Sequence, residues 1–296
     1  MTPPRLPAEI NRLVGQAMHR YRMLADGDRV MIAVSGGVDS LVLCRVLDLW
    51  CRKAPINYQL YPVHLDMGFG GYTDISTKRP RPGGEAEGSA REIDTESETE
   101  PQKKTDSSHQ DQAANPRRVA PKEPLTGTAT AVGAELEKTG LPHIMEETTY
   151  GPEALEAEEG KNGCYHCATR RRARLFALAR EHGCNKLALG HHQEDIIETF
   201  FLNLLYGGNI STMVPSQPLF NGNLTLIRPL ALLSKEMIHQ LGRLFGITAV
   251  PNPCPLNENS KRHSVRQLLN QLREQHPNLN ANVFAALGNV RPEYLL

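Results

Sequence analysis

The sequence predicts an α/β fold: a doubly wound parallel sheet with additional helices at the N- and C-terminal ends. Two observations predict this class. Short apolar runs of strand length alternate with longer segments whose apolar residues recur every three or four positions, which is typical of strand–helix–strand units in a parallel sheet. Helical patterns outside this alternation occur near the N-terminus, at 7–24, and near the C-terminus, at 259–275 and 280–287.

The elements are expected in a regular order along the 296 residues. Strands are expected at 30–34, 57–65, 143–149, 186–189, 224–230 and 247–250, because each is a short apolar run bounded by turn residues. The connecting helices are expected at 39–52, 131–140, 168–182, 193–206 and 234–245. Three of them end at a glycine, which commonly terminates helices. The stretch that holds Pro215 and Pro218 is expected to be irregular.

A long polar segment interrupts this order. No aromatic residue occurs between Thr73 and Thr149, and residues 76–125 are crowded with Pro, Gly, Glu, Ser, Lys and Gln. Such a segment cannot bury enough apolar surface to offset the entropy lost on ordering. We therefore expect a disordered insertion at about 76–125.

Composition excludes several classes of protein. Basic and acidic residues balance at 33 each, so a nucleic-acid partner would have to meet a local basic patch. No apolar run is long enough to span a membrane, and the N-terminal residues lack the apolar core of a signal peptide. The expected location is the cytoplasm, where the six cysteines would not form a disulfide framework.

The hexapeptide Ser35-Gly-Gly-Val-Asp-Ser40 joins the first strand to the following helix. A strand, a glycine turn and a helix N-terminus together aim free backbone N–H groups and a positive helix dipole at one point, which favours a phosphate or pyrophosphate. Ser35 and Ser40 can donate further hydrogen bonds, and Asp39 can hold Mg²⁺. The pattern is neither a Walker A loop nor the dinucleotide-binding fingerprint.

A second polar string, residues 190–199, follows the strand at 186–189. Ligands bind at the carboxyl ends of strands in doubly wound sheets, so His191 and Asp195, which precede or open the next helix, are candidate phosphate or magnesium contacts. Glu198 and Thr199 lie further along that helix, and an internal structural role is an equal alternative for them.

The cysteines divide into two groups by context. Cys44, Cys51 and Cys184 lie in apolar stretches and are expected in the core, whereas Cys164, Cys167 and Cys254 lie among polar, basic or proline residues. Cys164 and Cys167 stand one turn apart where a helix begins, and a helix N-terminus is expected to lower the thiol pKa. A redox pair, a zinc site completed by His166 or His263, and an iron–sulfur site are all compatible with this spacing.

Basic residues follow both cysteine segments. A run of like charges is usually a solvated face, but two such runs beside two candidate metal-ligand segments indicate a positive surface suited to an RNA backbone. The candidate RNA-binding residues are Arg170, Arg171, Arg172, Arg174, Lys261, Arg262 and Arg266.

Five segments, taken in order, carry a resemblance to a known family. SGGVDS, CYHCATRRR, LALGHHQEDIIETFFLNLLYGG, IRPLA and the cysteine of PNPCP resemble the tRNA 2-thiocytidine synthetase family of the PP-loop ATP pyrophosphatase superfamily. The resemblance implies a PP-loop fold of the adenine nucleotide alpha hydrolase type and ATP-dependent thiolation of a cytidine in the tRNA anticodon loop. Mg²⁺ and a [4Fe-4S] cluster are implied as cofactors, a sulfur donor such as a cysteine desulfurase and tRNA as partners, and a homodimer is left open.

The resemblance also implies roles for individual residues. The cluster would be held by Cys164, Cys167 and Cys254, and the catalytic residues would be Asp39, His191 and Asp195. ATP would be bound by Ala33, Ser35, Gly36, Gly37, Val38, Asp39, Ser40, Leu65 and Gly190. The domains implied are an N-terminal helix (1–27), a PP-loop ATP pyrophosphatase domain (28–250) that contains the insertion, and a C-terminal helical segment (251–296) with the third cluster cysteine.

Two features depart from the family pattern. Many members have lysine where this chain has Val38, and many have a second cysteine near the third ligand, where Cys254 stands alone. Two alternatives therefore stay open at this point. One is a lysidine-type PP-loop ligase with structural zinc, and the other is a non-catalytic ATP- and RNA-binding redox sensor.

Overall fold

The structure is a computed structural model that describes residues 4–69, 127–156, 163–254 and 261–294. The predicted disordered insertion at 76–125 lies outside these ranges. The helices are α1 Ala8–Arg20, α2 Val38–Cys51, α3 Gly127–Glu137, α4 Tyr150–Glu156, α5 Gly163–Glu181, α6 Gln193–Leu202, α7 Lys235–Leu244, α8 Lys261–Gln275 and α9 Leu279–Leu287. The strands are β1 Arg29–Ala33, β2 Gln59–Asp66, β3 Ile144–Glu147, β4 Lys186–Ala188, β5 Ser216–Leu219 and β6 Leu224–Ile227.

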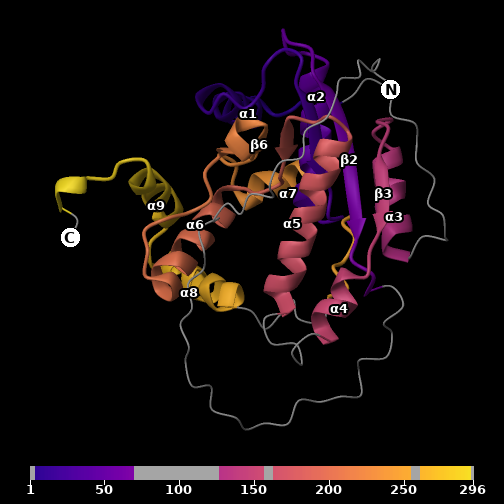
Figure 1. The fold of residues 1–296 in the computed structure, drawn as a ribbon. Coiled ribbons are helices and arrows are strands. Elements are labelled where there is room, and N and C mark those ends of the chain that lie inside the picture. The colour runs from indigo at the N-terminus through magenta and orange to yellow at the C-terminus, as the bar shows by residue number, and fades with distance from the viewer. Residues whose placement is uncertain (1–3, 70–126, 157–162, 255–260, 295–296) are drawn as a thin grey trace.

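The strands form one six-stranded sheet in the order β3-β2-β1-β4-β6-β5. All neighbouring strands are parallel except β5, which pairs antiparallel with β6. Helices connect the parallel strands, so the predicted α/β class with a doubly wound sheet is confirmed (Figure 1).

The structure corrects the prediction for two segments. The stretch around Pro215 and Pro218, expected to be irregular, forms the edge strand β5 from Ser216 onward, where Pro218 is tolerated because an edge strand does not need every N–H group. The strand expected at 247–250 is absent from the described sheet. Instead, Ile247 N–H donates to the Gly242 carbonyl and Val250 N–H donates to the Gly36 carbonyl, so this segment packs on the SGGVDS turn.

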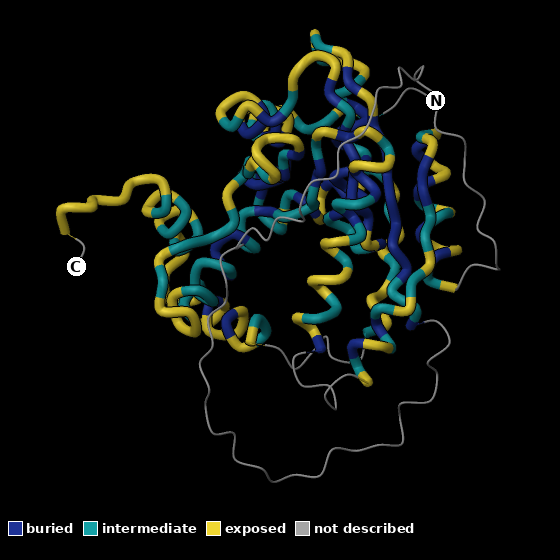
Figure 2. The backbone as a smooth tube through the Cα atoms, viewed as in Figure 1, coloured by how far each residue is buried: buried dark blue, intermediate teal, exposed yellow. Residues whose placement is uncertain are grey.

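Two apolar layers cover the two faces of the sheet. Val30 and Ile32 of β1 pack with α1, α2, α3 and α7 on one face, whereas Met31 and Ala33 pack with α5 on the other. This alternation follows from the two-residue period of a strand. Figure 2 shows the central strands buried and the C-terminal end of the chain largely exposed. No helix in the described ranges combines the length and apolarity needed to cross a membrane.

The strand order places the two polar strings together. The chain runs outward from β1 through β2 to β3, and then returns to the other side of β1 with β4. The point where the order reverses therefore lies between β1 and β4, and the crevice outside the carboxyl ends of these strands is where doubly wound folds bind ligands. The SGGVDS turn follows β1 and the 190–199 string follows β4, so both lie at this point.

The C-terminal helices form a smaller layer on α6. Val265 and Leu269 of α8 are buried against Ile197 of α6, and residues of α9 pack at the border of this cluster. Along the chain, the segment that carries Cys254 stands between α7 and α8.

Candidate functional site

The SGGVDS turn leaves the N-terminal end of α2 without a capping side chain. Ser40 Oγ accepts the Ser35 N–H at 3.1 Å and donates to the Gly37 carbonyl at 2.9 Å, so the turn closes on itself through one hydroxyl. Gly37 is the N-cap of α2 and supplies no side-chain hydrogen bond to the first turn of the helix. An anion can therefore take the place of a capping side chain.

Close packing holds this turn in position. A Cβ atom at Gly190 would lie 3.0 Å from the Ser40 backbone nitrogen and 3.1 Å from the Asp39 carbonyl group, so the end of β4 is pressed against the first turn of α2. Gly36 has a φ of +90°, and a Cβ there would lie 2.7 Å from Val132. Only glycine meets both demands at Gly36, a left-handed backbone and close neighbours.

Val38 packs inward on α7. A Cβ atom at Gly242 would lie 2.8 Å from Val38 Cγ2, so the valine fills the contact between α2 and α7. Val38, which stands where many family members have lysine, thus has a packing role in this chain. The SGGVDS turn itself contains no basic side chain.

A lysine that the sequence prediction missed reaches the turn from α7. Lys235 Nζ donates to both carboxylate oxygens of Asp39, at 2.6 and 2.8 Å. Its backbone N–H donates to Glu194 Oε2 at 3.0 Å, so this first residue of α7 connects the turn after β1 with the string after β4. One signal in the sequence could have found Lys235: it directly follows Ser234, the N-cap of the helix that comes after β6.

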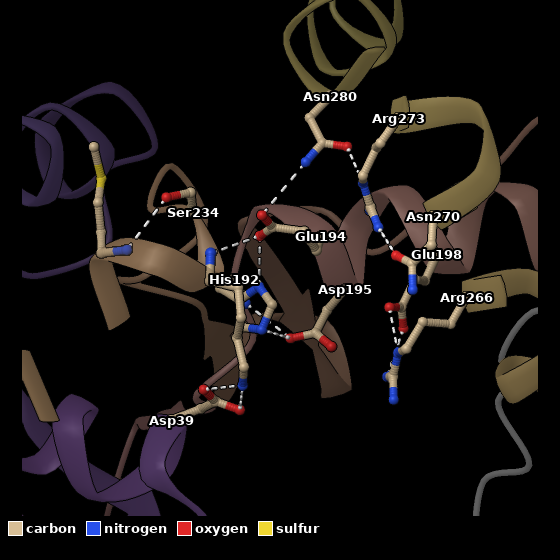
Figure 3. Close-up of polar contacts among 12 residues, drawn as sticks. Asp39, His192, Glu194, Asp195, Glu198, Ser234, Arg266, Asn270, Arg273 and Asn280 are labelled. Atoms are coloured by element: carbon tan, nitrogen blue, oxygen red, sulfur yellow. Dashed lines mark hydrogen bonds and ion pairs between the residues drawn. The ribbon is translucent and has the colours of Figure 1, made fainter. Parts of the chain in front are cut away.

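His192, Glu194 and Asp195 form a polar cluster beside Asp39 (Figure 3). His192 Nδ1 contacts Glu194 Oε2 at 3.0 Å, and Asp195 accepts the backbone N–H of His192 at 3.0 Å. Burial lowers the pKa of His192, but Glu194, Asp195 and Asp39 outweigh burial and raise it above the usual value. Asp195, predicted to be catalytic, is thus placed as a cap of α6 that faces this imidazole.

His191, the other predicted catalytic residue of this string, is neutral. Burial and the nearby guanidinium groups of Arg228, Arg262 and Arg171 lower the pKa of His191 to about 3. Arg228 Nε donates to His191 Nδ1 at 3.2 Å, and because arginine has no acceptor, the proton of the neutral ring lies on Nε2. His191 is therefore a hydrogen-bond donor at neutral pH. Arg228, which directly follows β6, was missed as a site residue.

A small cavity adjoins the turn on the α5 face of the sheet. It is lined by the predicted nucleotide contacts Ala33 and Leu65, by Val34 and Val63, and by Arg171 and Leu175 of α5. His64, also missed in the sequence, is buried at this end of β2. Its Nδ1 donates to the Val34 carbonyl at 2.8 Å, burial lowers its pKa, and its buried Nε2 has no partner in the described structure.

The candidate cluster cysteines are free thiols near one another. Cys164 and Cys167 lie in the first turn of α5, and Cys254 lies in the segment that packs on the SGGVDS turn. Burial raises the pKa of Cys164 and Cys167, and repulsion from Cys254 raises both further. The expected lowering of the thiol pKa by the helix N-terminus is therefore wrong. Within the described ranges, no three His, Cys, Asp or Glu side chains are arranged to hold a single metal ion.

The predicted RNA-binding residues divide by their partners. Arg266 forms a bidentate pair with the buried Glu198, Arg262 donates to Thr199 Oγ1 at 3.2 Å, and Lys261 lies over the Tyr206 ring. These contacts support the alternative that Glu198 and Thr199 are structural. On α5, Arg174 binds Glu146 and Glu181, and Arg170 binds Glu153. Arg171 and Arg172 form no ion pair within the described part of the chain.

Comparison with known proteins identifies the family. The PP-loop domain family matches residues 139–272. A tRNA-cytidine(32) 2-sulfurtransferase from Syntrophotalea carbinolica is 32% identical over 99% of this chain and 93% of its own length. Another, from Methylococcus capsulatus, is 33% identical over 98% of this chain and 82% of its own length. The chain belongs to the tRNA-cytidine(32) 2-sulfurtransferase family.

Family membership confirms the resemblance found in the motifs and the predicted enzyme class, an ATP-dependent tRNA sulfurtransferase with a PP-loop domain. Among solved structures, the U34-tRNA thiolase NcsA from Methanococcus maripaludis with its [4Fe-4S] cluster has a TM-score of 0.64. It is 18% identical, and the match covers 97% of this chain and 80% of that chain. At this identity, the likeness to NcsA supports only the fold of the present chain and not its function.

Proposed function

We propose that the protein thiolates a cytidine in the anticodon loop of tRNA by adenylating the C2 oxygen of the base and replacing it with sulfur. One observation supports the proposal: the SGGVDS turn after β1, His191 after β4 and the segment that leads to Cys254 lie at the same end of the parallel strands. The names of the relatives specify cytidine at position 32 as the base.

In the first step, the C2 oxygen attacks the α-phosphorus of ATP and pyrophosphate leaves. The free N–H groups of the first turn of α2 bind the departing phosphates, and the adenine lies against the ends of β1 and β2 at Ala33 and Leu65. Asp39 would hold Mg²⁺, which when bound would neutralise charge on the phosphates. We thus assign residues 35–40 to nucleotide binding.

His191 acts in this step as a neutral donor. Its Nε2–H can hydrogen-bond an α-phosphate oxygen as negative charge develops there, whereas an imidazole with a pKa of about 3 cannot serve as an acid at neutral pH. Arg228 fixes the tautomer through its bond to Nδ1. Asp195 acts through His192 and Glu194, as part of the scaffold that positions the loop.

The residues that would hold the cluster are Cys164, Cys167 and Cys254. Three free thiols that couple electrostatically are a donor set suited to a [4Fe-4S] cluster, although the fourth iron site would have no cysteine ligand from this set. When bound, the cluster supplies the iron site at which the sulfur atom is presented to the activated base. Sulfur at the oxidation level of hydrosulfide attacks C2, the C2–O bond breaks and AMP leaves. Where the donor is a cysteine desulfurase, its product is a persulfide, so a thiol reductant must supply two electrons to release that sulfur.

The tRNA lies over the basic end of α5 in this proposal. Arg172 is exposed and has no carboxylate partner in the described ranges, so its guanidinium group is open to phosphates of the anticodon loop, whereas Arg171 lines the cavity beside Ala33 and Leu65. Bases in such a loop are unpaired, and one of them can turn into the site between the thiols and the nucleotide.

The test is single replacement of each cluster cysteine by alanine in anaerobically purified protein. We expect Cys164→Ala, Cys167→Ala and Cys254→Ala to lose iron and acid-labile sulfide while ATP binding persists. Cys51→Ala is the matched control, because Cys51 donates to the Tyr58 carbonyl far from these thiols, and it should retain the iron content. Full iron content in all three variants, or stoichiometric zinc in the unmodified protein, would overturn the ligand assignment.

A further inference from the structure

The turn that binds the anion contains no basic side chain of its own. Its central position, where a side chain could face the ligand, is the inward-packed Val38. Pyrophosphate carries several negative charges, and binding it with backbone N–H groups alone leaves most of that charge without a cation. Any cationic side chain that contacts this anion must therefore come from another element.

Lys235 is placed to supply that cation. It is the first residue of α7, and its ammonium group lies 2.6 Å from Asp39, the second residue of α2. The Lys235 side chain is 40% exposed, so it is not locked in the core and can rotate away from Asp39. The N-termini of α2 and α7 both lie here, and their dipoles add to the attraction for an anion.

The lysine is also anchored at its backbone. Its N–H donates to Glu194, which in turn contacts His192 and, at 3.4 Å, Asn280 of α9. The backbone position of Lys235 is thus fixed to the string after β4, while the long side chain remains the adjustable part. This arrangement suits a residue that exchanges one partner for another without a movement of the helix.

We propose that Lys235 binds the β- and γ-phosphates of ATP and the pyrophosphate product, and that Asp39 holds its ammonium group until the nucleotide arrives. In the free protein the ammonium group occupies both carboxylate oxygens of Asp39; when the nucleotide arrives, the lysine exchanges this partner for the phosphates, which would leave the carboxylate free to hold Mg²⁺. The inference rests on the proposed binding of ATP at the SGGVDS turn, and on no step of tRNA thiolation.

Calorimetric titration of the full chain with Mg²⁺-ATP, inorganic pyrophosphate and AMP tests the proposal. In Lys235→Met, we expect the affinity for ATP and pyrophosphate to fall by about tenfold or more, because one charge-assisted hydrogen bond is lost. AMP lacks the two outer phosphates, so its affinity should change much less. Lys235→Arg should restore most of the loss. Lys138→Met is the matched control, since Lys138 also pairs with a carboxylate, Glu135, but directly follows the C-terminal end of α3 and forms no hydrogen bond or ion pair with the SGGVDS turn in the described part of the chain.

A second pair of variants separates a binding role from a structural bridge. Asp39→Asn frees the ammonium group and should tighten binding of pyrophosphate in the absence of metal, and Asp39→Asn with Lys235→Met should lose that gain. If Lys235→Met lowers only the melting temperature and leaves pyrophosphate affinity unchanged, or weakens AMP as much as ATP, the proposal is wrong. Because every readout is binding, a protein that bound ATP in this way but failed to thiolate tRNA would refute the proposed function and leave this inference intact.

Discussion

Arg266 is a charged residue beside the site, and we expect it to contribute to the stability of the fold and not to RNA binding. Its guanidinium donates to both oxygens of Glu198, at 2.8 and 2.9 Å, and Glu198 is 4% exposed in the interior of α6. In Arg266→Ala the carboxylate stays buried with no cation. Breaking a fully buried pair costs about 3–5 kcal/mol, and because half of the Arg266 side chain is exposed, we expect about 2–3 kcal/mol here.

The assay is urea unfolding followed by circular dichroism, with tRNA affinity measured on the same variants. Arg266→Ala should lower the free energy of unfolding by the stated amount, and Arg266→Ala with Glu198→Gln should recover part of it, because the buried group is then neutral. Arg172→Ala is the control: Arg172 is exposed and unpaired in the described ranges, so its loss should weaken tRNA binding and leave stability within about 0.5 kcal/mol. An Arg266→Ala protein of unchanged stability with weakened tRNA binding would refute the reasoning.

Two further predictions concern the residues after β4. The pKa of His191 is about 3 in the folded protein, below its value of 6.5 in the unfolded chain. Below about pH 6.5 the unfolded chain therefore binds a proton that the folded chain does not. The free energy of unfolding should fall there by up to about 1.4 kcal/mol per pH unit. His191→Gln should flatten this slope between pH 7 and 5 in urea titrations, and an unchanged slope would contradict the low pKa. Gly190→Ala places a Cβ 3.0 Å from a backbone nitrogen and should weaken ATP binding about tenfold or more by calorimetry, whereas Gly133→Ala, with its nearest neighbour at 3.9 Å, should not; equal affinities would refute the close packing.

The sequence predicted the sheet and the position of the site because both depend on local patterns. Apolar runs located β1, β2, β4 and β6, and the glycine turn located the start of α2. The edge strand β5 was missed because its residues carry prolines and little apolar periodicity, and its pairing depends on β6 as a partner. Residues 247–250 read as a strand because they are apolar, but they bury that surface against the SGGVDS turn.

The site residues that were missed are those whose role depends on a distant partner. Lys235 reads as an ordinary helix start until α7 packs beside α2, and Arg228 reads as the end of a strand until its guanidinium meets His191. Likewise, Arg266 reads as part of a basic surface until Glu198 is found beneath it. Spacing along the chain carries no information on such pairs, since they join residues that lie far apart in sequence.

The central claim is that the chain activates a tRNA cytidine with ATP and replaces its C2 oxygen with sulfur. The most direct measurement is nucleoside mass spectrometry of tRNA after incubation with the anaerobically reconstituted protein, Mg²⁺-ATP and a sulfide source. We expect ATP-dependent formation of 2-thiocytidine, with AMP and pyrophosphate formed in equal amounts, and no product from the Asp39→Ala variant. ATP cleavage that yields lysidine, or no modified cytidine from a protein that retains its cluster and binds ATP and tRNA, would contradict it.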